Sequence, residues 1–162
     1  MTDRELFIFT IADETPRFEK VFQAIPKEHR DYRPDPKSKT AMELAANMVG
    51  EAATLSELLQ KGSFDFALLK RPEDKEPEEI AKLFTETLTE ARKNASTMSD
   101  EDWRTEAIML MSGHEGWKTS RGAMVFSLLL DLIHHRGQLS TYLRAMGGKV
   151  PAIYGPSADE AD

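Results

Sequence analysis

The sequence has no cysteine among its 162 residues. Disulfide bonds, thiolate metal sites and cysteine nucleophiles are therefore excluded, because each of them requires a thiol. The chain also lacks a run of about 18 apolar residues, the length that a membrane-spanning helix needs. Its first ten residues, MTDRELFIFT, lack the basic start and the apolar run of a secretory signal. We therefore expect a protein of the cytoplasm.

An excess of basic residues is absent as well. The 28 acidic residues outnumber the 21 lysines and arginines, which gives a formal net charge of −7. Sequence-independent binding of nucleic acid needs a basic face, and docking on an anionic membrane needs a basic segment. We therefore expect neither nucleic acid nor a membrane as a partner. A hydrophobic content of 40% and a charged content of 30% are typical of a globular protein, and we expect a single domain over residues 1–162.

Clusters of proline and glycine divide the chain into four long segments in which apolar residues recur at helical spacing. Helices of this length and number, with one long crossover, predict an all-α fold, namely a four-helix bundle. The predicted helices run from about Asp3 to Ala24, from Ser38 or Thr40 to Lys61, from Pro77 to about Asn94, and from Thr119 or Ser120 to Met146.

Local signals refine this pattern. Pro16 should kink or break the first helix, because proline removes a backbone donor and clashes with the preceding turn. Thr40 and Glu43 have the spacing of a capping box at the start of the second helix. Residues 104–118 contain two glycines and no helical start, and we expect a long crossover with brief extended pieces. The C-terminal tail, KVPAIYGPSADEAD, is predicted to be irregular.

Two predicted helices carry polar residues on their inward stripes. Asp131 and His135 are spaced i and i+4, which places both on one face of the fourth helix, in the middle of its apolar stripe. Asn47 and Glu51 have the same spacing on the stripe of the second helix. If the two stripes face each other, these four side chains meet at one level of the core.

Two interpretations of this cluster stay open. Oxygen and imidazole ligands from facing helices are how bundles build metal sites, so the four residues can hold an ion. Alternatively, Asp131 and His135 form a buried ion pair, and Asn47 and Glu51 belong to a hydrogen-bonded network. Either way Asp131 needs a cation, because an isolated buried carboxylate costs several kcal/mol.

The neighbours of this pair have separate predictions. His134 and Arg136 should point away from Asp131, toward a rim or an interface between subunits. Gly137 lies inside a helix, where glycine costs about 1 kcal/mol relative to alanine, and we expect a close approach of another backbone or of a partner helix to offset that cost. His29 and His114 lie outside the helices and are expected to face solvent.

The segment HHRGQLSTYLRAMGGKVPAIYGPSADE, residues 134–160, resembles the DinB-like family, the damage-inducible four-helix bundles grouped with the YfiT-type metalloenzymes. DYRPDPKSKTAMELAANM, residues 31–48, resembles the family's entry to its second helix. The resemblance implies an antiparallel up-down-down-up bundle and a divalent metal, often nickel or zinc, held by three side chains. It also implies a homodimer.

In that family the ligands are typically one histidine of the second helix and an i, i+4 pair of the fourth. His135 matches the final ligand position. Asp131 falls where many relatives have histidine and others aspartate. Asn47 falls where the family usually has its histidine, and a neutral amide oxygen is a weak ligand for nickel or zinc. Either Glu51, one helical turn along, replaces Asn47 as the ligand, or the affinity for metal is lower, or the site is vestigial.

The predicted metal ligands are therefore Asn47, Asp131 and His135. The resemblance implies a metal-dependent enzyme acting on a small molecule, either a transferase that uses a low-molecular-weight thiol or a hydrolase. The alternative is a non-catalytic, dimeric bundle that keeps the fold with a degenerate site. A role in binding nucleic acid, suggested only by the family name, is opposed by the net charge of −7.

Overall fold

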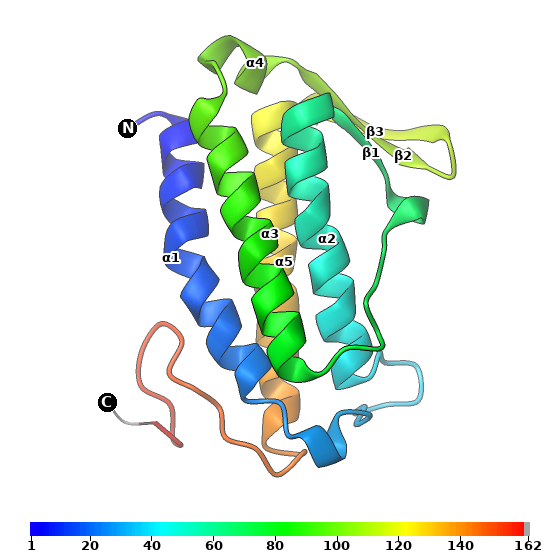
Figure 1. The fold of residues 1–162 in the computed structure, drawn as a ribbon, viewed down its shortest axis with the longest axis vertical. Coiled ribbons are helices and arrows are strands. Elements are labelled where there is room, and N and C mark those ends of the chain that lie inside the picture. The colour runs from blue at the N-terminus through cyan, green and yellow to red at the C-terminus, as the bar shows by residue number, and fades with distance from the viewer. Residues whose placement is uncertain (161–162) are drawn as a thin grey trace.

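The structure is a computed structural model that describes residues 1–160. In chain order its elements are α1 (Asp3–Gln23), η1 (Lys27–His29), α2 (Ala41–Lys61), β1 (Ser63–Asp65), η2 (Phe66–Leu68), α3 (Pro77–Thr97), α4 (Asp100–Arg104), β2 (Glu106–Met111), β3 (His114–Ser120) and α5 (Arg121–Leu143). The four long helices lie side by side, with α1 and α5 running in one direction and α2 and α3 in the other (Figure 1).

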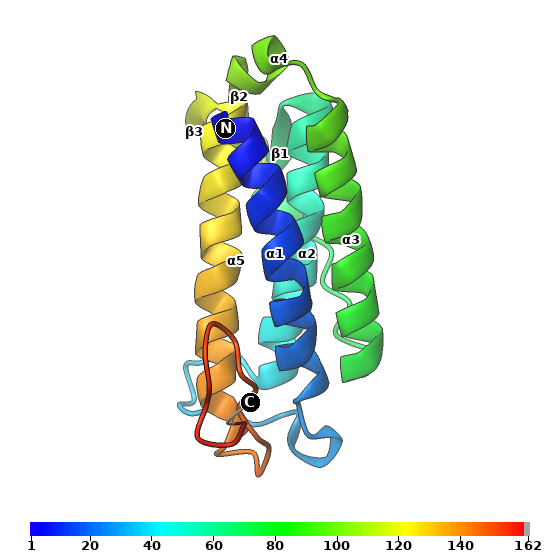
Figure 2. The same ribbon diagram turned by 90° about the vertical axis from the view of Figure 1, so that its left-hand side faces the viewer.

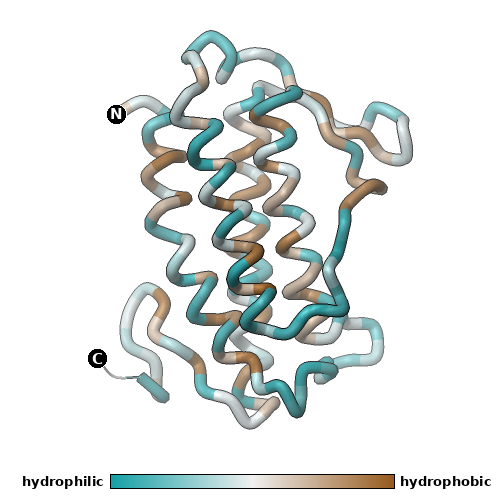
Figure 3. The backbone as a smooth tube through the Cα atoms, in the orientation of Figure 1, coloured by the Kyte–Doolittle hydropathy of each residue, from teal (hydrophilic) through white to brown (hydrophobic). Residues whose placement is uncertain are grey.

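The core lies between these four helices. In Figure 2, α1 lies between α5 and α3, and α2 lies behind it. Hydrophobic and hydrophilic segments alternate along each helix, whereas the connection from η2 to α3 is hydrophilic over most of its length (Figure 3). The inward side chains are large and apolar, including Phe7, Phe18, Phe22 and Phe84. Within residues 1–160, no helix combines the length and the hydropathy that crossing a bilayer requires.

The predicted start of α2 is confirmed. The Thr40 hydroxyl accepts the backbone N–H of Glu43, and the Glu43 carboxylate accepts the backbone N–H of Thr40, so both halves of the capping box are formed. The helix ends where Gly62 adopts a φ of 74°, in the left-handed region that glycine adopts without steric cost. These caps fix where α2 begins and ends, and thereby the level of its polar residues.

A break at Pro16 is not found, since α1 is continuous from Asp3 to Gln23. Proline removes one backbone hydrogen bond, but Ile11 and Phe18 are fully buried on either side of it. Burial of two such side chains contributes about 1.5–3 kcal/mol each, which offsets the loss of one hydrogen bond. Tertiary packing therefore holds the helix together through the proline.

The all-α description is incomplete, because the chain also forms a three-stranded sheet in the order β1-β2-β3. β1 pairs in parallel with β2, and β2 pairs antiparallel with β3. The two-residue turn between β2 and β3 has positive φ at Ser112 and Gly113, as a tight hairpin requires. The extended pieces expected within residues 104–118 are thus the two strands of a hairpin, which pairs with β1 at the end of α2.

The inward face of α5 differs from the predicted one. It is centred on Leu132 and Leu139, about 100° around the helix from Asp131. Asp131 is exposed, so its predicted place in the middle of the buried stripe is wrong. Arg136 was expected at a rim or an interface, but its side chain is only 2% exposed, because Glu14 of α1 and Tyr154 of the tail pair with it in the core.

Gly137 was expected to allow the close approach of another backbone or of a partner helix, and no part of the described residues makes such an approach. A Cβ built at Gly137 meets no atom within 4 Å. The close approaches occur at other glycines. A Cβ at Gly50 would lie 2.8 Å from the carbonyl oxygen of Lys70, and one at Gly122 would lie 2.2 Å from the indole of Trp103. Gly50 therefore lets the connection after η2 lie directly against α2.

Candidate metal centre

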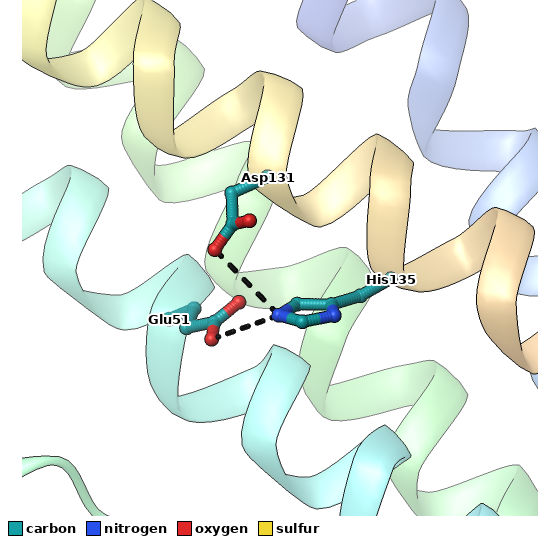
Figure 4. A group of neighbouring side chains, drawn as sticks. All are labelled: Glu51, Asp131 and His135. Atoms are coloured by element: carbon teal, nitrogen blue, oxygen red, sulfur yellow. Dashed lines mark ion pairs between the residues drawn. The ribbon is translucent and has the colours of Figure 1, made fainter.

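Glu51 of α2 and Asp131 and His135 of α5 converge at one point between the two helices (Figure 4). The three ligand atoms that they offer all lie within 4.8 Å of one another. His135 Nε2 lies 3.4 Å from Glu51 Oε1 and 3.6 Å from Asp131 Oδ2. The i, i+4 spacing of Asp131 and His135 places both on the side of α5 that faces α2. The packing of α5 beside α2 thus brings three of the four expected polar side chains together, although Asp131 lies outside the buried stripe.

These separations suit a divalent ion. Two ligands that each lie about 2.0–2.2 Å from a tetrahedral ion are themselves about 3.4 Å apart. A charge-assisted hydrogen bond would instead be about 2.7–2.9 Å long, so the imidazole and the two carboxylates are too far apart for optimal direct bonds. Two carboxylates and a neutral imidazole carry a charge of −2, which balances a divalent cation. Zinc, nickel and other first-row divalent metals accept such a mixed oxygen and nitrogen set.

The Glu51 carboxylate is 4% exposed and has one orphaned oxygen. Its Oε1 accepts a hydrogen bond of 2.5 Å from the side-chain amide of Asn47. Its Oε2 is buried and has no hydrogen-bond partner among the described residues. A buried, unsatisfied carboxylate oxygen costs free energy unless a cation or a donor meets it. The residues present therefore fit a bound metal ion.

Asn47 lies beside the cluster rather than in it. Its amide nitrogen donates to Glu51, and its amide oxygen accepts a 2.8 Å hydrogen bond from Nε of Arg71. The oxygen that would ligate a metal is thus already bonded. The structure places Asn47 as the residue that orients Glu51, one turn along α2, and brings Glu51 to the position next to His135.

The ring of His135 is oriented by Gln138. Nδ1 lies 3.3 Å from Oε1 of Gln138, so an Nδ1–H donates there and Nε2 is left to face the two carboxylates. Contact with the Glu51 carboxylate raises the pKa of His135 above its ordinary 6.5, and the charge of Asp131 adds to this, while burial acts in the opposite direction. Gln138 also donates to the hydroxyl of Tyr142 at 3.4 Å. Gln138 thus links His135 to Tyr142.

Exposure rises across the site from one side to the other. The side chains of Glu51, His135 and Asp131 are 4%, 20% and 52% exposed. One ligand is therefore fixed in the core, whereas another reaches solvent. A metal ion held by these residues would be accessible from the Asp131 side, which a catalytic ion needs and a purely structural ion does not.

The contacts of two arginines were not predicted from the sequence. Arg71 lies in the hydrophilic connection before α3, where no periodicity marks it, and only its contact with Asn47 reveals it. Arg136 donates to Glu14 and, at 2.6 Å, to the hydroxyl of Tyr154, which in turn donates to Glu14. Arg136 was predicted to point outward because its buried partner, Glu14 on α1, is distant in the sequence.

The remaining histidines lie outside the cluster. His29 and His114 are exposed, as predicted. His134 is also exposed and is not part of the cluster, although its ring centroid is 5.5 Å from that of His135. His135 is therefore the one histidine that the described residues bring to the carboxylates.

The model of the DinB family matches residues 1–162. The chain belongs to the DinB family. Among curated proteins, no sequence matches this DinB-family chain.

Two solved structures share its fold. A DinB-like protein of Bacillus subtilis, YjoA, is 19% identical, covers 90% of this chain and 96% of its own, and superposes with a TM-score of 0.70. A DinB-like protein of Bacillus cereus ATCC 10987 is also 19% identical, covers 93% of this chain and 97% of its own, and gives a TM-score of 0.72. The helices and the small sheet described above are thus a DinB-like fold.

Proposed function

We propose that this DinB-family protein is a metal-dependent enzyme acting on a small molecule, built on an up-down-down-up four-helix bundle. Glu51, Asp131 and His135 hold one divalent ion, nickel or zinc, between α2 and α5. The reaction is a transfer to or from a low-molecular-weight thiol, or a hydrolysis. Asn47, expected from the sequence as a ligand, instead positions Glu51.

One observation carries the proposal. The buried Oε2 of Glu51 has no partner among the described residues, and it belongs to a carboxylate whose other oxygen lies 3.4 Å from a histidine nitrogen. Proteins rarely leave such an oxygen unsatisfied, because the desolvation penalty is about 1–3 kcal/mol or more for a charged group. A metal ion between the carboxylates and His135 removes that penalty.

The chain's own residues prepare the site in three ways. Asn47 and Gln138 hold Glu51 and His135 in orientation by hydrogen bonds. Glu51 lies in the core and excludes water from one side. Asp131 lies on the exposed side, from which a substrate would approach. A divalent ion bound there supplies Lewis acidity and lowers the pKa of a water or thiol that it binds.

Metal uptake tests this directly. Protein purified without a histidine tag and stripped with chelator is titrated with Ni²⁺ and with Zn²⁺, and bound metal is measured by mass spectrometry and calorimetry. We expect about one ion per chain. Absence of uptake of either metal would overturn the proposal.

The reaction type is tested on the loaded protein. A thiol and 1-chloro-2,4-dinitrobenzene report thiol transfer, in which a C–S bond forms and chloride leaves. A p-nitrophenyl ester reports hydrolysis. Loss of the measured activity in His135→Ala, with the fold retained by circular dichroism, assigns that activity to the site.

A second candidate is a non-catalytic protein in which the cluster is an ion pair. This candidate is favoured by Asn47, which stands where the family usually has a histidine, so that α2 supplies no nitrogen ligand. The amide oxygen of Asn47 is also already bonded to Arg71. In that case a protonated His135 itself neutralises Glu51. The two candidates differ in thermal melting, since a ligand that binds only the folded state raises Tm. A saturating metal concentration raises Tm if the site binds metal, and leaves it unchanged if the cluster is only an ion pair.

The homodimer and the cytoplasmic location implied at the outset stay predictions. Sedimentation equilibrium of the metal-loaded protein measures the first, and fractionation of the source cells measures the second. Neither outcome changes the ligand set, which lies within one chain.

A further inference from the structure

A second cluster of charge lies beside the first turn of α2. The connections before α2 and α3, with the first turn of α2, enclose a cavity of about 380 Å³, which is lined by Arg33, Pro36, Lys37, Ser38, Lys39, Glu43, Arg71 and Glu73. Both connections are hydrophilic in Figure 3. The charged residues of the lining are Arg33, Lys37, Lys39 and Arg71, against Glu43 and Glu73. Four cations around one cavity contrast with the net charge of −7 of the whole chain.

Part of this charge is already neutralised. Glu43 closes the capping box of α2 and lies 3.6 Å from Arg33. In contrast, Lys37, Lys39 and Arg71 form no ion pair with any carboxylate among residues 1–160. Three cations therefore face the cavity with Glu73 as the remaining acidic residue. Such a concentration of like charge in a concave surface raises the local concentration of anions.

Arg71 connects this cavity to the metal centre. Its Nε donates to Asn47, and Asn47 donates to Glu51, so two hydrogen bonds separate the guanidinium from a metal ligand. Its terminal nitrogens donate no hydrogen bond to any described residue. Gly50 makes the arrangement possible, because any side chain there would push away the backbone of Lys70. The arginine is held by Nε while its outer edge stays available.

We propose that this cavity binds an anionic group, a carboxylate or a phosphate, of the small molecule whose other end reacts at the metal centre. Arg71 supplies a planar pair of donors to the oxyanion, and Lys37 and Lys39 supply charge. The reacting end then lies toward Glu51, Asp131 and His135. The anion site itself stands on the cavity and its cations, whereas its place in the reaction rests on the proposed function.

Anion binding is measured first, on chelator-treated protein without metal. Inorganic phosphate and succinate are titrated separately while amide shifts are followed by NMR, which distinguishes the two oxyanions. We expect shifts at Arg71 and Lys39, and about tenfold weaker binding in Arg71→Gln and in Lys37→Gln/Lys39→Gln, the loss of one or two charge-assisted contacts. Lys61→Gln/Lys93→Gln removes the same charge at the other end of the helices and should bind as wild type. Absence of binding, or equal loss in the control variant, overturns the proposal.

The link to the metal is measured second, on Ni²⁺-loaded protein. Mercaptocarboxylates of increasing chain length are compared with alkanethiols of the same length. If thiolate and carboxylate bind simultaneously, the gain over the alkanethiol peaks at one length and disappears in Arg71→Gln. The link between the cavity and the metal is contradicted if the gain in affinity over the alkanethiol does not vary with chain length. It is also contradicted if that gain is retained in Arg71→Gln. Failure of the proposed function is separate, because it shows as absent metal uptake while phosphate or succinate still binds.

Discussion

At the scale of single residues, the proposed metal centre assigns different roles to Glu51, as a ligand, and to Asn47, as the residue that orients it. Glu51→Gln removes a negatively charged ligand, and we expect metal affinity to fall by more than about 100-fold. Asn47→Ala removes only an orienting hydrogen bond, and about a tenfold loss is expected. Calorimetric titration with Ni²⁺ measures both. If Asn47→Ala costs as much affinity as Glu51→Gln, Asn47 is a ligand and the assignment made from its hydrogen bonds is wrong.

The buried ion pair of Glu14 and Arg136 carries a prediction about stability. Their side chains are 6% and 2% exposed, and Tyr154 bonds to both. Glu14→Leu leaves a buried guanidinium without its carboxylate, which should lower the free energy of unfolding by about 3–5 kcal/mol. Urea denaturation measures this.

The double variant Glu14→Leu/Arg136→Met is the control for this pair. It removes both charges and should cost clearly less than the sum of the two single changes. A single variant that loses less than about 1 kcal/mol would show that the pair behaves as an exposed one. Additive losses would show that the two charges do not interact.

Asp65 sets a pH dependence. Its carboxylate accepts the backbone N–H of Ala67, and those of Gly113 and Ser112 in the hairpin turn, and these bonds lower its pKa below the ordinary 3.8. The folded-state pKa is the lower one, so the stabilisation is complete above 3.8 and is lost as the pH falls through the folded value. The Gly113 amide proton should titrate with a midpoint below 3.8 in NMR spectra. A midpoint at or above 3.8, or the same titration in Asp65→Asn, contradicts this.

The residues at the site show what periodicity can and cannot predict. The i, i+4 pairs named Glu51, Asp131 and His135 correctly as neighbours, because helical geometry alone brings them to facing sides. Periodicity placed the buried face of α5 on Asp131, since it took Arg136 for an outward charge. Arg136 is buried only because Glu14 and Tyr154, more than a hundred residues before it and eighteen after it, meet it in the fold.

At the scale of elements, Gly137 in α5 offers a simple test. Nothing among the described residues lies within 4 Å of a Cβ there, so alanine gains helix propensity without a clash. We expect Gly137→Ala to raise the free energy of unfolding by about 0.5–1 kcal/mol. Gly122→Ala is the matched control in the same helix, and it should destabilise the protein because its Cβ overlaps the indole of Trp103. Urea denaturation at low protein concentration measures both. A loss of stability in Gly137→Ala would mean that another chain packs there.

The elements themselves were predictable to different degrees. Local signals located the long helices well, as the capping box of Thr40 and Glu43 and the cap at Gly62 show. The sheet was not predicted, because β1 pairs with a strand that lies about forty residues later, and β3 is almost entirely exposed and polar. Pairing across such a separation leaves little trace in a local pattern.

At the scale of the whole molecule, the site joins helices that come from opposite halves of the chain. Glu51 is on α2 and the other two ligands are on α5, and these helices also pack directly against each other. A bound ion would thus tie the two halves together. The basic cavity lies beside the start of α2, and Arg71 reaches from it toward the same centre. α2 therefore carries the proposed ligand Glu51, its orienting residue Asn47 and Glu43 of the cavity lining.

The most direct test of this account is a crystal structure of tag-free protein loaded with Ni²⁺ or Zn²⁺, with diffraction recorded on both sides of the metal's absorption edge. The account predicts one anomalous peak per chain, about 2.0–2.2 Å from Glu51 Oε2 or Oε1, Asp131 and Nε2 of His135, with Asn47 still bonded to Arg71. A map without a peak between α2 and α5, or a peak coordinated by Asn47 in place of Glu51, would contradict it.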